Sequence, residues 1–191
     1  MKIGFRMIDK IVLADTSFYI CFFKYLKQPD YLIKIINNFK FHLPGIVKKE
    51  LRFKEDEYAL LKSETSITEF DDLGLNFSVP LEPFFGKGQV GKGENEIIVL
   101  AYVLSSVTPD TGFCFILDDP LKRKFVFRQI KGLYTKMMCT PSFIGDCCLE
   151  HNLISPEETL LMLSKLKTST FGIDIKVVDD LMERLRNNGK N

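Results

Sequence analysis

The sequence contains no tryptophan, only two histidines and no long run of uncharged apolar residues. Without such a run, and without a signal-peptide pattern, no membrane-spanning helix is expected, so we expect a cytoplasmic protein with no membrane partner. The two histidines, His42 and His151, offer no Ser-His-Asp or Cys-His arrangement for nucleophilic catalysis. We expect both to be structural.

The sequence also lacks a Cys-x-x-Cys pair, although it has five cysteines. This absence gives no support to a zinc ribbon or a redox motif. Cys114 and Cys139 lie inside apolar runs. We expect buried thiols at both positions.

The chain also has no large excess of positive charge. The chain has 26 Lys and Arg against 25 Asp and Glu, a formal net charge of +1. The net charge alone does not indicate a nucleic-acid-binding protein, so any polyanion would have to bind to a local patch of positive charge. At 191 residues the chain is long enough for one α/β domain with a short appendage.

Short apolar runs alternate with helical patterns along most of the chain. The best-defined helix covers Gly93 to Val107, where apolar residues recur at helical spacing. Further helices are expected over 18–39 with a break at 28–30, 44–53, 54–69, 120–131 and from 140 onward, and strands over 11–14, 41–43, 76–79, 113–117 and 134–139. This order predicts an α/β fold with a central parallel sheet flanked by helices.

The last part of the chain differs from this pattern. Ser155 and Pro156 begin a capped helix that we expect to run to about Lys167, and Asp174 can cap a final helix after a break at Phe171-Gly172. We therefore expect a domain over residues 1–152 and a C-terminal helical extension over residues 153–191, packed on the same domain.

Two apolar runs of the predicted sheet end in an acid. Asp15 follows the run from Ile11 to Ala14, and Asp118 follows the run from Phe113 to Leu117. In an open parallel sheet, ligands bind outside the carboxyl ends of the strands. A carboxylate placed there loses hydration and repels a like neighbour, and a bound metal ion would offset both costs. The alternative is that each Asp only caps the following helix.

Three glutamates extend this acidic set. Glu50 lies on the same helical stripe as Val47 and Leu51, so it faces inward, unless it lies at the margin of the stripe and pairs with a lysine. Glu94 and Glu96 open the best-defined helix, about 200° apart around its axis. One site cannot easily use both, and either one could simply stabilise the helix N-terminus.

Acids that converge on one sheet edge suit Mg²⁺ or Mn²⁺, which prefer hard oxygen ligands and can activate water for phosphodiester hydrolysis. Basic residues flank these acids and could bind a phosphate backbone. Each cluster of basic residues, taken alone, is equally typical of an ordinary surface exposed to water. The candidate substrate-binding residues are Lys48, Lys49, Lys92, Lys122 and Arg123. The glycine-rich segment 86–93 is not a P-loop, because it lacks the Gly-Lys-Ser/Thr ending and the preceding apolar strand that a P-loop requires.

Four short motifs, taken in order, resemble those of PIN-domain nucleases. They are Leu13-Ala14-Asp15-Thr16-Ser17, the Pro44 to Leu51 segment with its Val47 and Glu50, Gly93-Glu94-Asn95-Glu96-Ile97-Ile98, and Asp118-Asp119-Pro120-Leu121-Lys122-Arg123. Asn152-Leu153-Ile154 is similar to a step that precedes C-terminal helices in one subfamily of predicted nucleic-acid-binding proteins. Ile97, Lys122 and Asn152 depart from that subfamily's pattern.

The resemblance implies a three-layer PIN fold and an Mg²⁺- or Mn²⁺-dependent nuclease, usually a ribonuclease, related to the toxins of toxin–antitoxin pairs. It places the catalytic and metal-binding acids at Asp15, Glu50, Glu96 and Asp118. Glu94, Asp119 and Arg123 are secondary candidates, Arg123 as a phosphate contact. Candidate partners are an RNA or single-stranded nucleic-acid substrate, an antitoxin protein and a second copy of the chain.

Two other functions fit the same sequence. One is a catalytically weak PIN-like module that binds RNA or a protein. The other is a phosphatase that forms an aspartyl-phosphate, which requires a second Asp two residues after the nucleophile. Ser17 occupies that place after Asp15, which disfavours the phosphatase.

Overall fold

Five parallel strands form the centre of the molecule in a computed structural model that describes residues 8–52, 55–69, 85, 92–107 and 112–188. The strands lie in the order β3-β2-β1-β4-β5. Their bounds are β1 Ile8–Ala14, β2 Phe39–Leu43, β3 Thr68–Glu69, β4 Phe113–Ile116 and β5 Met137–Met138. Every pairing between neighbouring strands is parallel.

The two central strands carry apolar side chains on both faces. Val12 pairs with Phe41 of β2 and with Cys114 of β4, and all four residues of β4 are buried. A strand that is covered on both faces reads as a continuous apolar run, because no side chain alternates toward water. The acids that end these runs therefore lie at the carboxyl edge of the sheet.

The strand order changes direction between β1 and β4. The chain runs outward from β1 through β2 to β3, then returns and continues from β4 to β5 on the other side of β1. Because crossovers between parallel strands are right-handed, such a reversal opens a crevice at the carboxyl ends of the two strands where it occurs. Asp15 and Asp118 follow these two strands.

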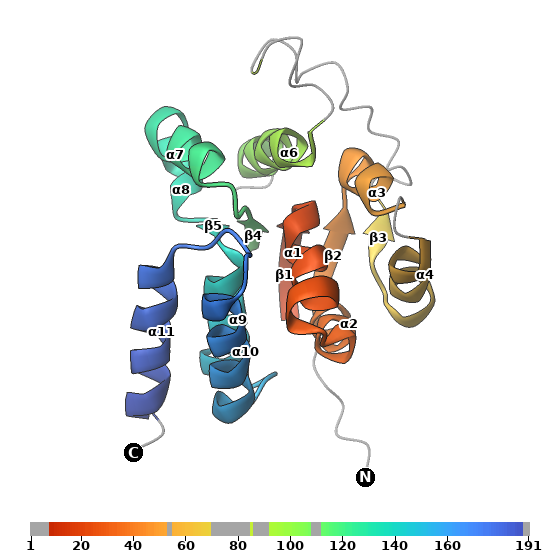
Figure 1. The fold of residues 1–191 in the computed structure, drawn as a ribbon. Coiled ribbons are helices and arrows are strands. Elements are labelled where there is room, and N and C mark those ends of the chain that lie inside the picture. Colours follow the sequence, from red (N-terminus) through yellow and green to blue (C-terminus); the bar gives the residue numbers. More distant parts are fainter. Residues whose placement is uncertain (1–7, 53–54, 70–84, 86–91, 108–111, 189–191) are drawn as a thin grey trace.

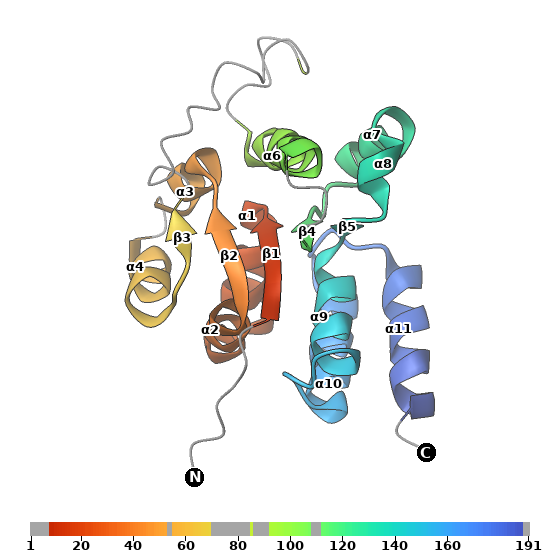
Figure 2. The same cartoon turned by 180° about the vertical axis from the view of Figure 1, so that it is seen from behind.

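Helices flank the sheet, as Figures 1 and 2 show from opposite sides. Helix α1 contacts β1, α2 contacts β2, and α6 contacts both β1 and β4. The bounds are α1 Thr16–Ile20, α2 Pro29–Asn38, α3 Gly45–Arg52, α4 Glu55–Glu64, α6 Gly93–Val107, α7 Pro120–Gln129, α8 Lys131–Tyr134 and α9 Thr140–Leu149. A π-helical segment, η1 (Cys21–Leu26), lies between α1 and α2 and ends at Lys27, whose φ of 54° is left-handed.

The last two helices pack on the rest of the chain. Helix α10 (Pro156–Thr168) begins with a capping box of Ser155 and Glu158, and α11 (Ile175–Asn188) packs against α9 and α10. The buried residues between them are Cys148, Leu163, Val178, Leu181 and Leu185. Gly145 of α9 allows this approach, because an added Cβ would lie 2.9 Å from Leu181 Cδ2.

Most of the expected elements are confirmed, and two expectations about strands are wrong. The helix over Gly93–Val107 has the expected bounds. Thr68 and Glu69 form β3, although a helix was expected to continue through them, because they pair with the end of β2. Only Met137–Met138 of the expected strand over 134–139 pairs with β4, since helix α8 extends to Tyr134. The strand expected over 76–79 lies outside the described residues.

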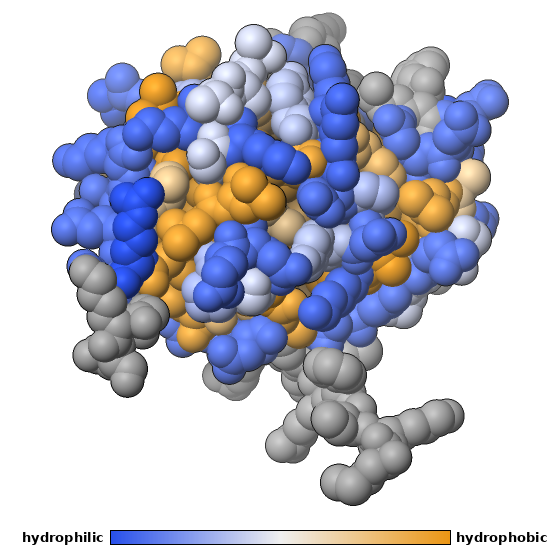
Figure 3. Space-filling model, turned by 60° about the horizontal axis from the view of Figure 1, so that its bottom comes forward, coloured by the Kyte–Doolittle hydropathy of each residue, from blue (hydrophilic) through white to orange (hydrophobic). Residues whose placement is uncertain are grey.

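The surface opposite the acid-bearing edge carries apolar areas separated by charged side chains, as Figure 3 shows. None of the helices within the described ranges is long and apolar enough to cross a membrane. All five cysteines are free thiols and buried, as expected for Cys114 and Cys139.

Candidate active site

Asp15 ends β1 and is 1% exposed. Its Oδ1 accepts a hydrogen bond from the backbone N–H of Phe18 at 3.1 Å, so it caps α1. Its Oδ2 accepts from the backbone N–H of Asp118 at 3.2 Å. Asp15 therefore caps α1 and also lies at the predicted edge of the sheet. Its bond from Asp118 connects the end of β1 to the end of β4.

Asp118 is 7% exposed and does not cap the helix that follows it. Its Oδ1 accepts from the backbone N–H of Thr140 at 2.8 Å, and its Oδ2 accepts from Thr140 Oγ1 at 2.5 Å. Asp119 is the cap of α7, because its Oδ1 accepts from the N–H groups of Leu121 and Lys122. The interpretation that Asp118 caps the following helix is therefore wrong. Asp118 is instead held by hydrogen bonds from Thr140, the first residue of α9.

Burial raises the pKa of both carboxyl groups. For Asp15 the larger cause is desolvation, and the charges of Asp118 and Glu94 add to it. Desolvation also raises the pKa of Asp118, while the bonds from Thr140 and the charge of Arg123 oppose it. Neither Asp forms a salt bridge with any of the described residues. The two acids thus share a recess without a direct cationic partner.

Glu50 joins three helices. It lies on α3, its Oε2 accepts a hydrogen bond from the hydroxyl of Thr16 on α1, and its Oε1 accepts from the backbone N–H of Gly93 at 3.1 Å. Gly93 permits this contact, because an added Cβ would lie 2.9 Å from both Glu50 Oε2 and Val47 Cγ2. The glycine of the Gly-Glu-x-Glu motif is therefore required by the close approach of α3 to α6.

Glu96 is buried and turned toward α3. Its Oε2 accepts from the backbone N–H groups of Ile46 at 2.8 Å and Val47 at 3.4 Å, so Glu96 caps α3 from a distant part of the chain. Desolvation raises its pKa to about 7, against the lowering effect of these bonds.

Glu94 occupies the position nearer to the aspartates. It lines a cavity of about 370 Å³ together with Ser17, Asp118 and Asp119. Its charge contributes to the raised pKa of Asp15. The sequence resemblance favours Glu96 over Glu94 as the fourth acid of the metal site. The structure favours Glu94 instead, because Glu94 lines the cavity with Asp118.

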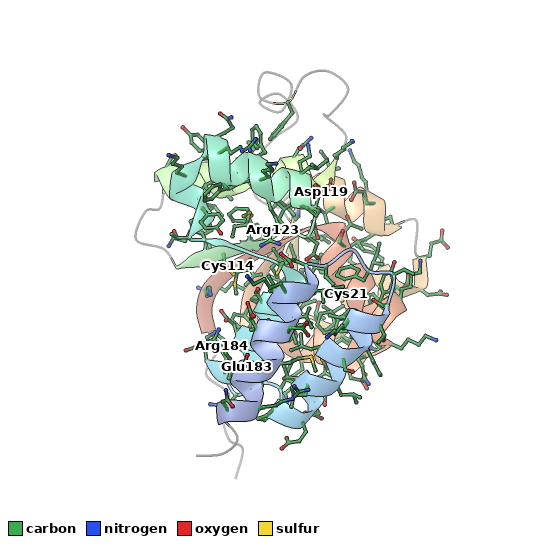
Figure 4. The ribbon with its side chains drawn as sticks, turned by 60° about the vertical axis from the view of Figure 1, so that its left-hand side comes forward. Cys21, Cys114, Asp119, Arg123, Glu183 and Arg184 are labelled. Atoms are coloured by element: carbon green, nitrogen blue, oxygen red, sulfur yellow. The ribbon has the colours of Figure 1, made fainter. Side chains whose placement is uncertain are left out.

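Arg123 lies on the other side of Asp118. It lines a second cavity of about 510 Å³, which shares Asp118 and Gly172 with the first. Its buried Nε has no hydrogen-bond partner among the described residues. Figure 4 shows Arg123 on α7 above the upper end of α11 and Asp119 just before α7, while Glu183 and Arg184 lie further along α11.

The basic residues expected to bind substrate differ in their surroundings. Lys48 is buried and its ammonium forms a salt bridge with Glu69, and its contact with phosphate stays a prediction. Lys49 and Lys92 are exposed. Lys122 lies over the ring of Phe85, with its ammonium 5.2 Å from the ring centroid.

Among the four predicted acids, the hydrogen bonds join Asp15 to Asp118, Glu50 to Thr16 and Gly93, and Glu96 to the start of α3. Within the described part of the chain, no group of three or more His, Cys, Asp or Glu side chains is arranged to hold one metal ion. Sequence reasoning missed the roles of Thr16, Gly93 and Thr140, which position the acids through hydrogen bonds. The sequence predicts that Thr140 begins a helix. Its bond to Asp118 could not be predicted, because the two residues are 22 positions apart and no local sequence pattern marks the contact.

No protein-family model matches the chain, and no match was found among curated proteins or solved structures. Any assignment of function therefore rests on the fold and on the local geometry.

Proposed function

We propose that this protein is a metal-dependent nuclease of the PIN type that hydrolyses RNA at the carboxyl ends of β1 and β4. The observation that carries the proposal is the Asp15–Asp118 pair, buried at the point where the strand order reverses and joined by a hydrogen bond. Structural carboxylates are normally paired with a cation or left in water, whereas these two are buried and form no salt bridge with another described residue. A ligand that supplies positive charge explains it.

The donor set fits Mg²⁺ or Mn²⁺. These ions bind through one or two carboxylates and keep several waters, so two aspartates suffice without a cage of protein ligands. Asp15 and Asp118 would hold the ion, with Glu94 and Asp119 at the wall of the same cavity. When bound, the metal would lower the pKa of a water molecule and neutralise charge on the phosphate.

The remaining residues support this pair in different ways. Thr140 fixes both oxygens of Asp118, and the α1 N-terminus fixes Asp15. Arg123, whose Nε is unpartnered among the described residues, is placed to hold a phosphate oxygen beside Asp118. Glu94, which lines the cavity with Asp118, would orient the attacking water. Glu50 and Glu96 keep α3 and α6 in register and act on the site only through that packing.

A second function has a specific observation in its favour. Because Glu50 and Glu96 are engaged by backbone N–H groups, the acids left for a metal are fewer than the resemblance implies. The same edge could then bind RNA, or a restraining antitoxin-like protein, without cleaving it. Metal-dependent turnover separates this binding module from the nuclease.

The test is an RNA cleavage assay on the purified chain with a fluorescent single-stranded RNA, in Mg²⁺, in Mn²⁺ and in EDTA. We expect cleavage that depends on the added metal and that falls by more than about 100-fold in Asp118→Asn, because one of two proposed ligands is lost. The matched control is Glu183→Gln, an exposed acid on α11 away from the cavities. Full activity in Asp118→Asn, or an equal loss in both variants, would overturn the proposal.

A further inference from the structure

The cavity beside Asp118 has a lining of two kinds. Its volume of about 510 Å³ lies within the range of small-molecule sites. Its charged lining residues are Asp118, Arg123, Lys124 and Asp174, and its apolar and aromatic lining includes Phe127 and Tyr134. A ligand that fills this space must combine a charged part with a flat apolar part.

The aromatic lining is unusual for its exposure. Phe127 on α7 is 53% exposed and Tyr134 on α8 is 46% exposed, and their rings meet edge to face with centroids 4.9 Å apart. An edge-to-face pair leaves ring faces uncovered by its partner. Rings of this size are usually buried, because their exposure forgoes hydrophobic stabilisation.

Two of the charged lining residues, Arg123 and Lys124, are cations that could hold a phosphodiester beside the acids Asp118 and Asp174. Arg123 has a buried Nε with no hydrogen-bond partner among the described residues, and Lys124 is exposed one residue further along α7. Both line the same cavity as the aromatic pair. Asp118, Pro120 and Gly172 line both this cavity and the one at the proposed metal site, so the two spaces adjoin.

We propose that this cavity is a nucleotide subsite, in which an unpaired base packs against the Phe127–Tyr134 pair, stacked on one ring and in contact with the other, while Arg123 and Lys124 hold its phosphate. The inference rests on the proposed nuclease function and adds to it a substrate class, single-stranded nucleic acid. Stacking of a base on an aromatic side chain requires an open base face, which a paired and stacked duplex does not offer.

The recessed position of the acids supports the same class. Asp118 is 7% exposed, and the segment between α10 and α11 contributes Gly172 to both cavities that contain it. A strand that reaches such a recess must fit its base and phosphate into the space together. A single strand can turn one base into the cavity, whereas a duplex must first break a base pair.

The test is fluorescence anisotropy with a labelled RNA of about eight nucleotides, single-stranded or as a duplex, in EDTA so that no cleavage interferes. We expect the wild-type chain to bind the single strand more tightly. In Phe127→Ala and Tyr134→Ala the dissociation constant for the single strand should rise by about 5- to 150-fold, equivalent to the ~1–3 kcal/mol of one stacked base. Tyr134→Phe keeps the ring and should retain tight binding.

The matched control is Tyr102→Ala, which removes an equally exposed ring (47%) on α6 that lines neither cavity. An unchanged dissociation constant in Phe127→Ala and Tyr134→Ala, or an equal loss in Tyr102→Ala, would overturn the subsite. Preference of the wild-type chain for the duplex would overturn the substrate class. If the subsite variants lose binding while the wild type never cleaves RNA in any metal, the proposed hydrolysis fails and the subsite stands.

Discussion

Two pairs of acids that look alike in the sequence are treated differently by the fold. Asp15 and Asp118 converge at the ends of β1 and β4, where burial and their mutual charge raise the pKa of Asp15. Glu50 and Glu96 lie between α3 and α6, and backbone N–H groups satisfy their carboxylates. Asp15 and Asp118 form no ion pair with another described residue, whereas Glu50 and Glu96 link α3 to α6. Acids at one edge of a sheet are therefore not equivalent, and burial with a nearby like charge distinguishes Asp15 even though it also caps a helix.

The sharpest test of this difference compares the two glutamates that open α6. Glu94→Gln should lower RNA cleavage by about tenfold or more, because Glu94 lines the cavity with Asp118 and Asp119. Glu96→Gln should change cleavage by less than about threefold, because the amide oxygen still accepts from Ile46 and Val47. The sequence-based ranking of the two residues predicts the reverse order. Steady-state rates of both variants on one RNA decide between them.

A third variant at this position controls for folding. Glu96→Leu removes the acceptor and should destabilise the protein by about 1–2 kcal/mol, the cost of a lost cap, measured by urea unfolding. If Glu96→Gln proves as inactive as Asp118→Asn while it remains fully folded, Glu96 belongs to the catalytic set and the contrast between the two acid pairs disappears.

A smaller effect is expected at the contact between α3 and α6. Gly93→Ala places a Cβ 2.9 Å from Val47 and Glu50, and should reduce stability by about 1–3 kcal/mol through overpacking and the displaced Glu50 carboxylate. Gly132→Ala on α8 meets nothing within 4 Å and should be neutral or stabilising by up to about 1 kcal/mol. Equal free energies of unfolding for the two variants would show that the close approach at Gly93 is unimportant.

The sequence was sufficient for the elements that are long or fully buried. The apolar runs at β1 and β4 and the helical spacing of α6 arise from local chemistry and are confirmed. Strand β3, only two residues long, and the roles of Gly93 and Thr140 depend on contacts between residues far apart in the chain. Such contacts leave no periodic signal, so the acids could be named but their partners could not.

Thr140→Val tests the support of Asp118 with a modest change. Valine keeps the size of the side chain but removes the hydroxyl that donates to Asp118 Oδ2, while the backbone N–H bond to Oδ1 remains. We expect stability to fall by about 1–2 kcal/mol and cleavage by about two- to tenfold. Thr140→Ser restores the hydroxyl and should recover most of the activity, and a failure of this rescue would assign the loss to packing.

The pH dependence of stability should have an uncommon sign. The pKa values of Asp15 and Asp118 are raised and that of Glu96 is about 7, against 4.5 for an ordinary Glu, so the folded metal-free chain binds protons that the unfolded chain has released. This stability is fully present below about pH 4 and is lost as the pH rises through about 7. Melting temperatures in EDTA should fall from about pH 5 to about pH 8, and Asp15→Asn should flatten the slope. A rising slope would contradict the burial of these acids.

The central claim, that Asp15 and Asp118 form a divalent-cation site, is tested most directly by titrating the metal-free chain with Mn²⁺ in a calorimeter at about pH 7.5. We expect saturable binding that is lost in Asp15→Asn and in Asp118→Asn, is retained in Glu183→Gln, and raises the melting temperature of the wild-type chain. Binding that survives unchanged in both aspartate variants, or no binding to the wild-type chain, would contradict the account.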